Sequence, residues 1–179
     1  CQVYLRDEVD LSPLEAHANH LWHFLANDGI DGISDFVPFT RLSGLGQTWR
    51  DGMHFPGSMN QLERMAWTNF RPKDISALPE APLLKSLSLV SANIESLAGV
   101  ERYKALSELS ICRAARLSDL SAVQALKSLS RLSIESCKRL SSVAASIQPL
   151  PLEELSLINC GAIPSLDFIR ELRQLRKLV

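Results

Sequence analysis

The sequence predicts an α/β solenoid, a curved stack of short repeats with a parallel β-sheet on the concave face and short 3₁₀ or helical segments on the convex face. Three observations predict it: a leucine recurs at a nearly constant interval, the residues after it alternate with a period of two, and the rest of each unit has a period of three. An aromatic-rich N-terminal helical cap over residues 1–60 is expected to precede the stack.

Each unit opens with a leucine that recurs from residue 62 onward. The intervals between successive copies are 22, 22, 23, 23 and 23 residues, a regularity typical of repeat architectures. Most units continue as Leu-x-x-Leu-x-Leu or Leu-x-x-Leu-x-Ile, and the first is a looser copy. We therefore predict about five repeats and the start of a sixth over residues 61–179. The opening leucines are Leu62, Leu84, Leu106, Leu129, Leu152 and Leu175.

The first half of each unit has the period of a β-strand. In the second unit, Leu87 and Leu89 point to one face and the residues beside them to the other. The second half has one apolar residue in three, which suits 3₁₀ turns because side chains at i and i+3 eclipse. One unit cannot bury its own leucines, so neighbouring units must stack around a shared core. The period of three is seen at Leu97, Val100, Tyr103 and Leu106.

This repeat resembles that of the leucine-rich repeat family, and its length is similar to the short internalin-like or cysteine-containing types. The resemblance implies a horseshoe-shaped scaffold that holds a protein partner and performs no catalysis. Bacterial proteins of this style include effector arms, toxin-neutralising immunity proteins and adhesion modules, and all three remain open. The main alternative is the substrate-recruiting arm of an enzyme, for example a ligase, whose catalytic domain lies beyond Val179.

Residues 1–60 differ from the repeats in composition. Nine of the 11 aromatic residues lie at or before position 70, and all four histidines lie at or before position 54. Ser12-Pro13-Leu14-Glu15 has the form of a capping box with proline at the first helical position. It predicts a helix over about 13–27 that ends near Gly29. A short strand is expected at Val3–Leu5 and irregular structure over 29–60, with Leu42 and Leu45 as the remnant of a degenerate repeat.

Both ends suggest a domain of a longer protein. The chain begins with Cys1 rather than methionine, and a sixth strand begins at Leu175 without a polar closing unit after it. An unclosed solenoid would leave a strand edge and part of its leucine core in water.

Charge and cysteine content limit the partners. The chain carries 19 Lys and Arg against 20 Asp and Glu, so it offers no basic field for nucleic acid. No stretch reaches the ~18 apolar residues of a membrane span. Four cysteines without framework spacing favour a reduced, cytoplasmic setting. By repeat position, Cys137 and Cys160 should be buried one above the other, and Cys112 should face outward from the sheet.

The cap offers three weaker chemical interpretations. His17, His20 and His23, with Glu15 nearby, could give metal-dependent chemistry on one helix, but zinc sites usually need three or four converging ligands. The Gly44-Leu45-Gly46 run lacks the lysine and hydroxyl residue of a phosphate-binding loop. We therefore expect no metal, cofactor or catalytic residue. The segment 49–55 is either an exposed aromatic recognition loop or a plug for the open end of the first repeat.

The solvent face of the sheet is the predicted partner-binding surface. Charged residues in its third column alternate in sign over the last four units, and serines fill its fifth column. Such a floor can accept a protruding element of a partner, and the same residues keep the free sheet soluble. Arg102, on the outer segment, is expected to lie away from this surface. The candidate residues are Arg64, Asn69, Ser88, Glu108, Ser110, Arg113, Arg131, Ser133, Glu135, Glu154, Ser156, Ile158 and Asn159.

Overall fold

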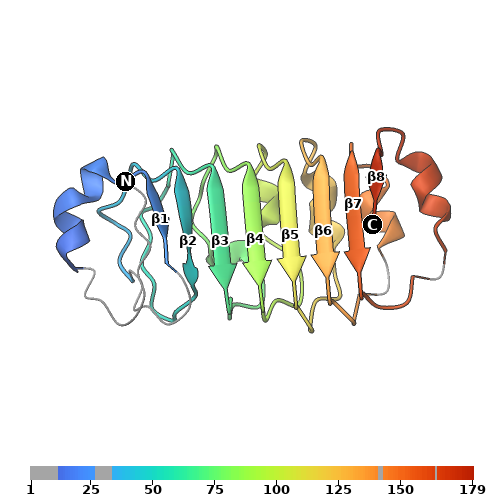
Figure 1. Ribbon diagram of the computed structural model, residues 1–179, viewed down its shortest axis with the longest axis horizontal. Helices are drawn as coiled ribbons and strands as arrows, with labels where there is room; N and C mark the ends of the chain where they lie inside the picture. The colour runs from blue at the N-terminus through green and yellow to red at the C-terminus, as the bar shows by residue number, and fades with distance from the viewer. Residues whose placement is uncertain (1–11, 27–33, 141–142, 164) are drawn as a thin grey trace.

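The computed structural model describes residues 12–26, 34–140, 143–163 and 165–179. These residues contain one parallel sheet of eight strands, which follow each other in chain order (Figure 1). Each strand pairs with the next after a crossover through the outer side of the same repeat, so the topology is that of a solenoid. The strands are β1 (His23–Leu25), β2 (Gly44–Thr48), β3 (Arg64–Thr68), β4 (Ser86–Val90), β5 (Glu108–Cys112), β6 (Arg131–Glu135), β7 (Glu154–Ile158) and β8 (Lys177–Leu178).

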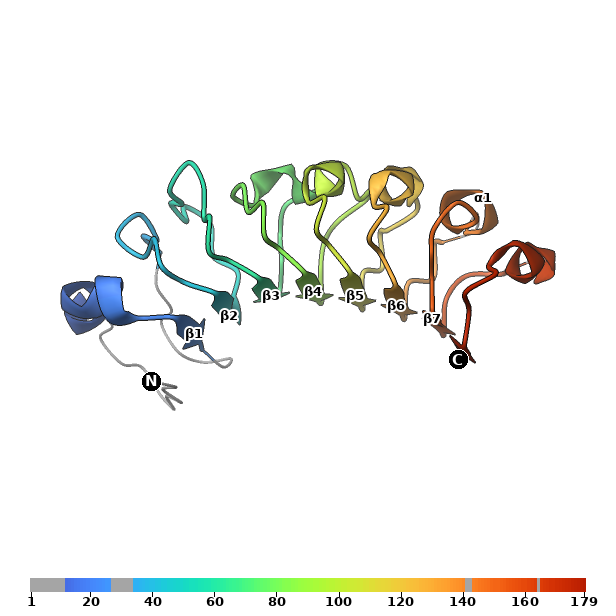
Figure 2. The same ribbon diagram turned by 90° about the horizontal axis from the view of Figure 1, so that it is seen from above.

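The helical segments lie on the convex side and the sheet on the concave side, as Figure 2 shows from above. All but one of the segments that follow η1 are 3₁₀ turns, as the period of three predicted. This arrangement confirms the leucine-rich repeat solenoid. The segments are η1 (Ser12–His20), η2 (Ile75–Ala77), η3 (Val100–Arg102), η4 (Ser121–Ala125), α1 (Ala144–Ile147) and η5 (Asp167–Glu171).

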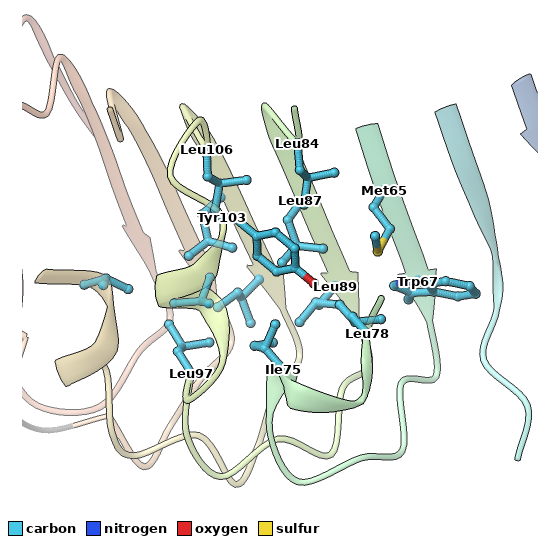
Figure 3. Close-up of a cluster of buried hydrophobic side chains, with 14 of the residues drawn as sticks. Met65, Trp67, Ile75, Leu78, Leu84, Leu87, Leu89, Leu97, Tyr103 and Leu106 are labelled. Atoms are coloured by element: carbon cyan, nitrogen blue, oxygen red, sulfur yellow. The ribbon is translucent and has the colours of Figure 1, made fainter. Parts of the chain in front are cut away.

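The leucine core fills the space between these two layers. Strand pairing puts residues of the same repeat position side by side, so that Leu87 pairs with Leu109 and Leu89 with Ile111. All four side chains are buried, and Figure 3 shows Leu87 and Leu89 facing Leu97 and Tyr103 from the convex side. Fully burying such a side chain stabilises the fold by about 1.5–3 kcal/mol. The repeats thus share one continuous core.

Residues 1–60 contribute two strands to this sheet that we did not predict. The helix expected over about 13–27 is wrong: a 3₁₀ helix ends at His20, and β1 follows. The physical reason is the alternation at His23, Phe24 and Leu25, which buries Phe24 and exposes its two neighbours. β2 lies where irregular structure was expected and pairs in register with β3, which confirms the degenerate repeat at Leu42 and Leu45.

Strands before and after residue 60 belong to the same sheet. The division into a cap and a repeat array therefore stays a prediction. The strand expected at Val3–Leu5, Cys1 and the helix end near Gly29 lie outside the described residues.

The aromatic residues of the segment 49–55 pack inward, whereas Asp51, Gly52 and His54 are exposed. Trp49 is buried, with its ring centroid 4.7 Å from that of Phe70 and 5.3 Å from that of Trp67. Phe55 stacks on Phe36 with 5.3 Å between ring centroids. Aromatic pairs in these arrangements add about 0.5–1.5 kcal/mol beyond the burial of their area. The aromatic residues therefore fill the core near β2 and β3, and the stack continues beyond them to β1.

The five repeats that contain β3 to β7 turn sharply at their eighth position, one residue after the strand. The φ angles there lie between 50° and 57°, in the left-handed region that residues other than glycine rarely adopt. In the first four of these turns, the backbone N–H of the eighth residue donates to a carbonyl oxygen of the next repeat at 2.8 Å. This hydrogen bond holds the turn in place. The ninth residue then points into the core. The five residues are Asn69, Ser91, Arg113, Ser136 and Asn159.

The cysteines follow these positions with one correction. Cys137 is buried as expected, whereas Cys160, at the same position of the next repeat, is only half-buried. It lies in the last complete repeat, where the covering layer is thinner: only short β8 follows β7. Burial raises the pKa of the Cys137 thiol to about 11 and also raises the pKa of Cys160. Cys112 lies half-buried in the seventh column of the sheet.

Among the three cysteines that the structure describes, we expect a thiol reagent to modify native Cys112 first, Cys160 more slowly and Cys137 last. The thiolate is the reacting form, and with a pKa of about 11 the Cys137 thiol stays protonated at neutral pH in addition to being inaccessible. Mass spectrometry of peptides from a timed alkylation gives the three rates, and the denatured protein, in which the rates should converge, is the control. Equal rates for native Cys137 and Cys112 would contradict the repeat register.

Candidate partner-binding face

The third column of the sheet carries alternating charges, in the register that the sequence predicts. Glu108 pairs with Arg131 across β5 and β6, and Arg131 with Glu154 across β6 and β7. Two ion pairs form along this column: Arg131 with Glu108, and Lys177 with Glu154 at 3.5 Å between Nζ and Oε2. Because these side chains are largely exposed, each pair is worth about 0–1 kcal/mol. The column is thus electrically balanced over its C-terminal half.

Replacing Arg131 with glutamate should lower the melting temperature, and more at low salt than at high salt. The change aligns three carboxylates, and like charges directly opposite in a sheet destabilise it by about 0.2–1 kcal/mol per pair. Screening is weak at ~0.01 M and strong at ~1 M ionic strength, so thermal unfolding is compared at these two values. Lys104→Glu, the same charge change at an exposed position outside the strands, is the control. If both variants lower the melting temperature equally at both ionic strengths, the charged side chains of the third column do not interact.

The fifth column is a row of serines in four neighbouring strands. Ser88 pairs with Ser110, Ser110 with Ser133, and Ser133 with Ser156. All four side chains are half-buried, and within the described part of the chain their hydroxyls make no hydrogen bond. Each hydroxyl can therefore donate one hydrogen bond and accept others. The floor of the sheet offers polar groups that the fold itself does not use.

A shallow depression of about 320 Å³ joins these two columns from β4 to β8. This size is at the lower end of the range for ligand-binding pockets. Half of its lining residues were not among the predicted site residues, and three of these are leucines that the repeat assigns to the core. The residues missed are Ser86, Leu109, Leu132, Leu155, Lys177 and Val179. The predicted residues that line it are Glu108, Ser110, Arg131, Ser133, Glu154 and Ser156.

The other predicted residues lie elsewhere on the sheet. Glu135 and Ile158 are exposed partners in the seventh column. Asn69, Arg113 and Asn159 occupy the left-handed turns at the strand ends, so they border the sheet rather than its floor. There Arg113 Nε donates to the Ser91 hydroxyl at 3.1 Å.

A second hollow of about 440 Å³ lies over the N-terminal strands β1 to β4. It contains the two remaining predicted residues, Arg64 and Ser88, but also His23 and Leu25 from the unpredicted strand β1. The signal that could have revealed this strand is the short alternation from His23 to Leu25. The hollow is also lined by Gly44, Leu45, Met65, Ala66 and Ser86.

His17, His20 and His23 do not lie on one helix as a set of metal ligands. His17 and His20 lie in η1, whereas His23 lies in β1 with its Nε2 atom 3.3 Å from the Ser43 hydroxyl. The prediction that all three share a helix is therefore wrong. Across the described residues, no three His, Cys, Asp or Glu side chains converge in a way that could hold a metal ion. In the same part of the chain, every helix is too short or too polar to cross a bilayer.

Together, the sheet, the 3₁₀ turns and the repeat register define a leucine-rich repeat fold. No family model and no curated protein sequence matches the chain. Two solved internalin structures from Listeria monocytogenes share its fold. Internalin InlF superposes with a TM-score of 0.55 at 16% identity, over 98% of this chain and 66% of that chain, so this chain spans just under two thirds of InlF. Internalin C2 gives a TM-score of 0.54 at 16% identity, over 92% of this chain and 83% of that chain. At this identity the likeness establishes the fold.

Proposed function

We propose that the concave face binds a protein partner and that the chain performs no catalysis itself. The observation that carries the proposal is the row of four serine hydroxyls, which make no hydrogen bond to any described residue and lie beside a column of ion pairs. The leucine-rich repeat fold generally serves protein–protein contact, which supports the same reading. The cytoplasmic setting predicted from cysteine usage remains part of this proposal.

The size of the depression favours a protruding element of the partner. With strands ~4.8 Å apart, the five strands β4 to β8 cover roughly 20 Å, and an α-helix with its side chains is about 10–12 Å wide. The edge of the face adds exposed Ile158 and Glu135 as apolar and acidic contacts. A helix or a loop from the partner can therefore lie across the serine floor with charged groups on one side.

We expect Ser110→Trp and Ser133→Trp to abolish most partner binding without harm to the fold. Both serines lie at the centre of the face, and interfaces concentrate their binding energy in central positions. Partners are first captured from the source cell and identified, and the Kd of the purified partner is then measured by calorimetry. We expect it to rise by about tenfold or more, which corresponds to ~1.4 kcal/mol.

The matched control is Ala145→Trp, which adds the same ring at an exposed position of α1 on the convex side (Figure 2). It should leave the Kd unchanged. Thermal unfolding verifies that all three variants fold. If both serine variants unfold like the wild type and still bind the partner with its original Kd, the concave face is not the binding surface.

A further inference from the structure

The N-terminal hollow differs in charge from the depression over β4 to β8. Arg64 lies in its third column, where its register neighbours are Gly44 and Ser86, and neither carries a charge. Within the described residues the Arg64 side chain makes no ion pair and no hydrogen bond. The adjacent Glu63 is paired with Lys85 at 2.9 Å. Among the described residues, the positive charge of Arg64 in this hollow is therefore not compensated.

The walls of the hollow come from β1 and its floor from small residues. A Cβ atom at Gly44 would lie 2.5 Å from His23 Cδ2, and one at Gly46 would lie 2.8 Å from Leu25 Cδ2. The side chains of His23 and Leu25 thus lie across bare backbone of β2. Leu25 is nevertheless 40% exposed. It therefore forms an apolar wall that is open to solvent, and Arg64 lies on the same hollow in β3.

These features fit an apolar side chain next to a carboxylate. Burying the apolar group against Leu25 and Ala66 removes apolar surface from water. The planar guanidinium of Arg64 can bind a carboxylate with two parallel hydrogen bonds, which are stronger than those between neutral groups. A cationic segment would instead meet the unpaired charge of Arg64, and such repulsion is costly at an interface.

We propose that this hollow binds an acidic segment of the protein partner, in which an aspartate or glutamate stands beside a bulky apolar residue. The proposal rests on the proposed function and specifies the chemistry of the partner. The carboxylate binds Arg64, and the apolar side chain lies against Leu25 and Ala66, which both line the hollow. The ion pairs of the C-terminal half contribute no such preference, because their charges are already balanced.

The test uses a random peptide library displayed on phage and the purified chain. We expect enrichment of peptides with an acidic residue beside a leucine or an aromatic residue. The enriched peptide, and a copy with Asn or Gln in place of Asp or Glu, are then titrated by fluorescence anisotropy. Loss of one charge-assisted contact should raise the Kd of the amide copy by about tenfold to a hundredfold.

Two variants of the chain complete the test. Arg64→Glu should weaken the acidic peptide to a similar degree, and Ala66→Trp should fill the floor and block binding. Lys104→Glu makes the same charge change outside the face and should leave the Kd within about twofold, well under the tenfold that 1.4 kcal/mol represents.

The inference is overturned if no peptide is enriched, if the enriched peptides lack a carboxylate, or if Arg64→Glu binds them as the wild type does. If Ser133→Trp weakens binding of the peptide and Arg64→Glu does not, the N-terminal hollow is not the binding site for the acidic segment. The concave face then remains the binding surface. Independence from Ser133→Trp, Arg64→Glu and Ala66→Trp would overturn both proposals.

Discussion

Replacing Gly99 with alanine should lower the free energy of unfolding by about 2–5 kcal/mol, as the sum of two costs. Gly99 precedes η3 with a φ of 92°, and for other residues a left-handed conformation costs about 1–2 kcal/mol. In addition, its Cβ would lie 2.7 Å from the Ser76 backbone nitrogen and 2.9 Å from the Ser76 Cα. Overpacking of this kind costs about 1–3 kcal/mol, and backbone atoms of a neighbouring repeat cannot rotate away.

The control is Gly52→Ala, which separates the two costs. Gly52 also has a left-handed φ, 80°, but a Cβ there would meet nothing within 4 Å. Its substitution should therefore cost only the conformational part, about 1–2 kcal/mol. Denaturant unfolding of both variants gives the difference. Equal losses of stability would show that η2 and η3 are not packed as closely as the structure indicates.

Replacing Arg102 with alanine should cost about 3–6 kcal/mol, because about two charge-assisted hydrogen bonds worth about 1.5–3 kcal/mol each are lost. Arg102 lies on the outer segment, as expected, and its half-buried side chain reaches into the preceding repeat. Its Nη2 lies 3.0 Å from the Ile75 carbonyl oxygen and 3.2 Å from that of Ser76, and it also donates to the Leu78 carbonyl. One NH₂ group has two hydrogens, so about two full bonds are lost.

Two further variants test this contact. Arg102→Lys keeps the charge but loses the planar group, which lies 5.2 Å from the centroid of the Tyr103 ring, and should recover only part of the stability. Arg116→Ala, in the next repeat, removes an exposed arginine whose ion pair to Glu95 measures 3.7 Å, and should cost no more than about 1 kcal/mol. If Arg102→Ala and Arg116→Ala unfold at the same denaturant concentration, Arg102 does not join the repeats.

The repeat register was predictable because it depends on one periodic property. Every strand from β3 onward begins two residues after an opening leucine, so the columns of charge and serine follow from counting alone. The N-terminal strands were not predictable in the same way. Gly44 and Gly46 weaken the strand signal of β2, and the capping box at Ser12 correctly begins a helical segment but does not encode where it ends.

The two halves of the candidate site differ in the same way in how well the sequence predicts them. Its C-terminal half follows from Glu108, Arg131 and Glu154, whose neighbours are set by the repeat. Its N-terminal half needs His23 and Leu25, which come from a three-residue strand whose alternation is only a weak signal. The contacts of Arg102 were equally hidden, since they depend on carbonyl groups 24 to 27 residues earlier in the chain. Such groups carry no side-chain signal.

The left-handed turns at the eighth position have a consequence for how this surface can change over time. Glycine would fit those backbone angles at lower cost, yet the five turns hold asparagine, serine and arginine. Because a backbone hydrogen bond to the next repeat holds most of these turns, the side chain is free to vary. Each repeat thus keeps one position at the border of the face where substitution leaves the core intact. New specificity can evolve there one repeat at a time, without a new fold.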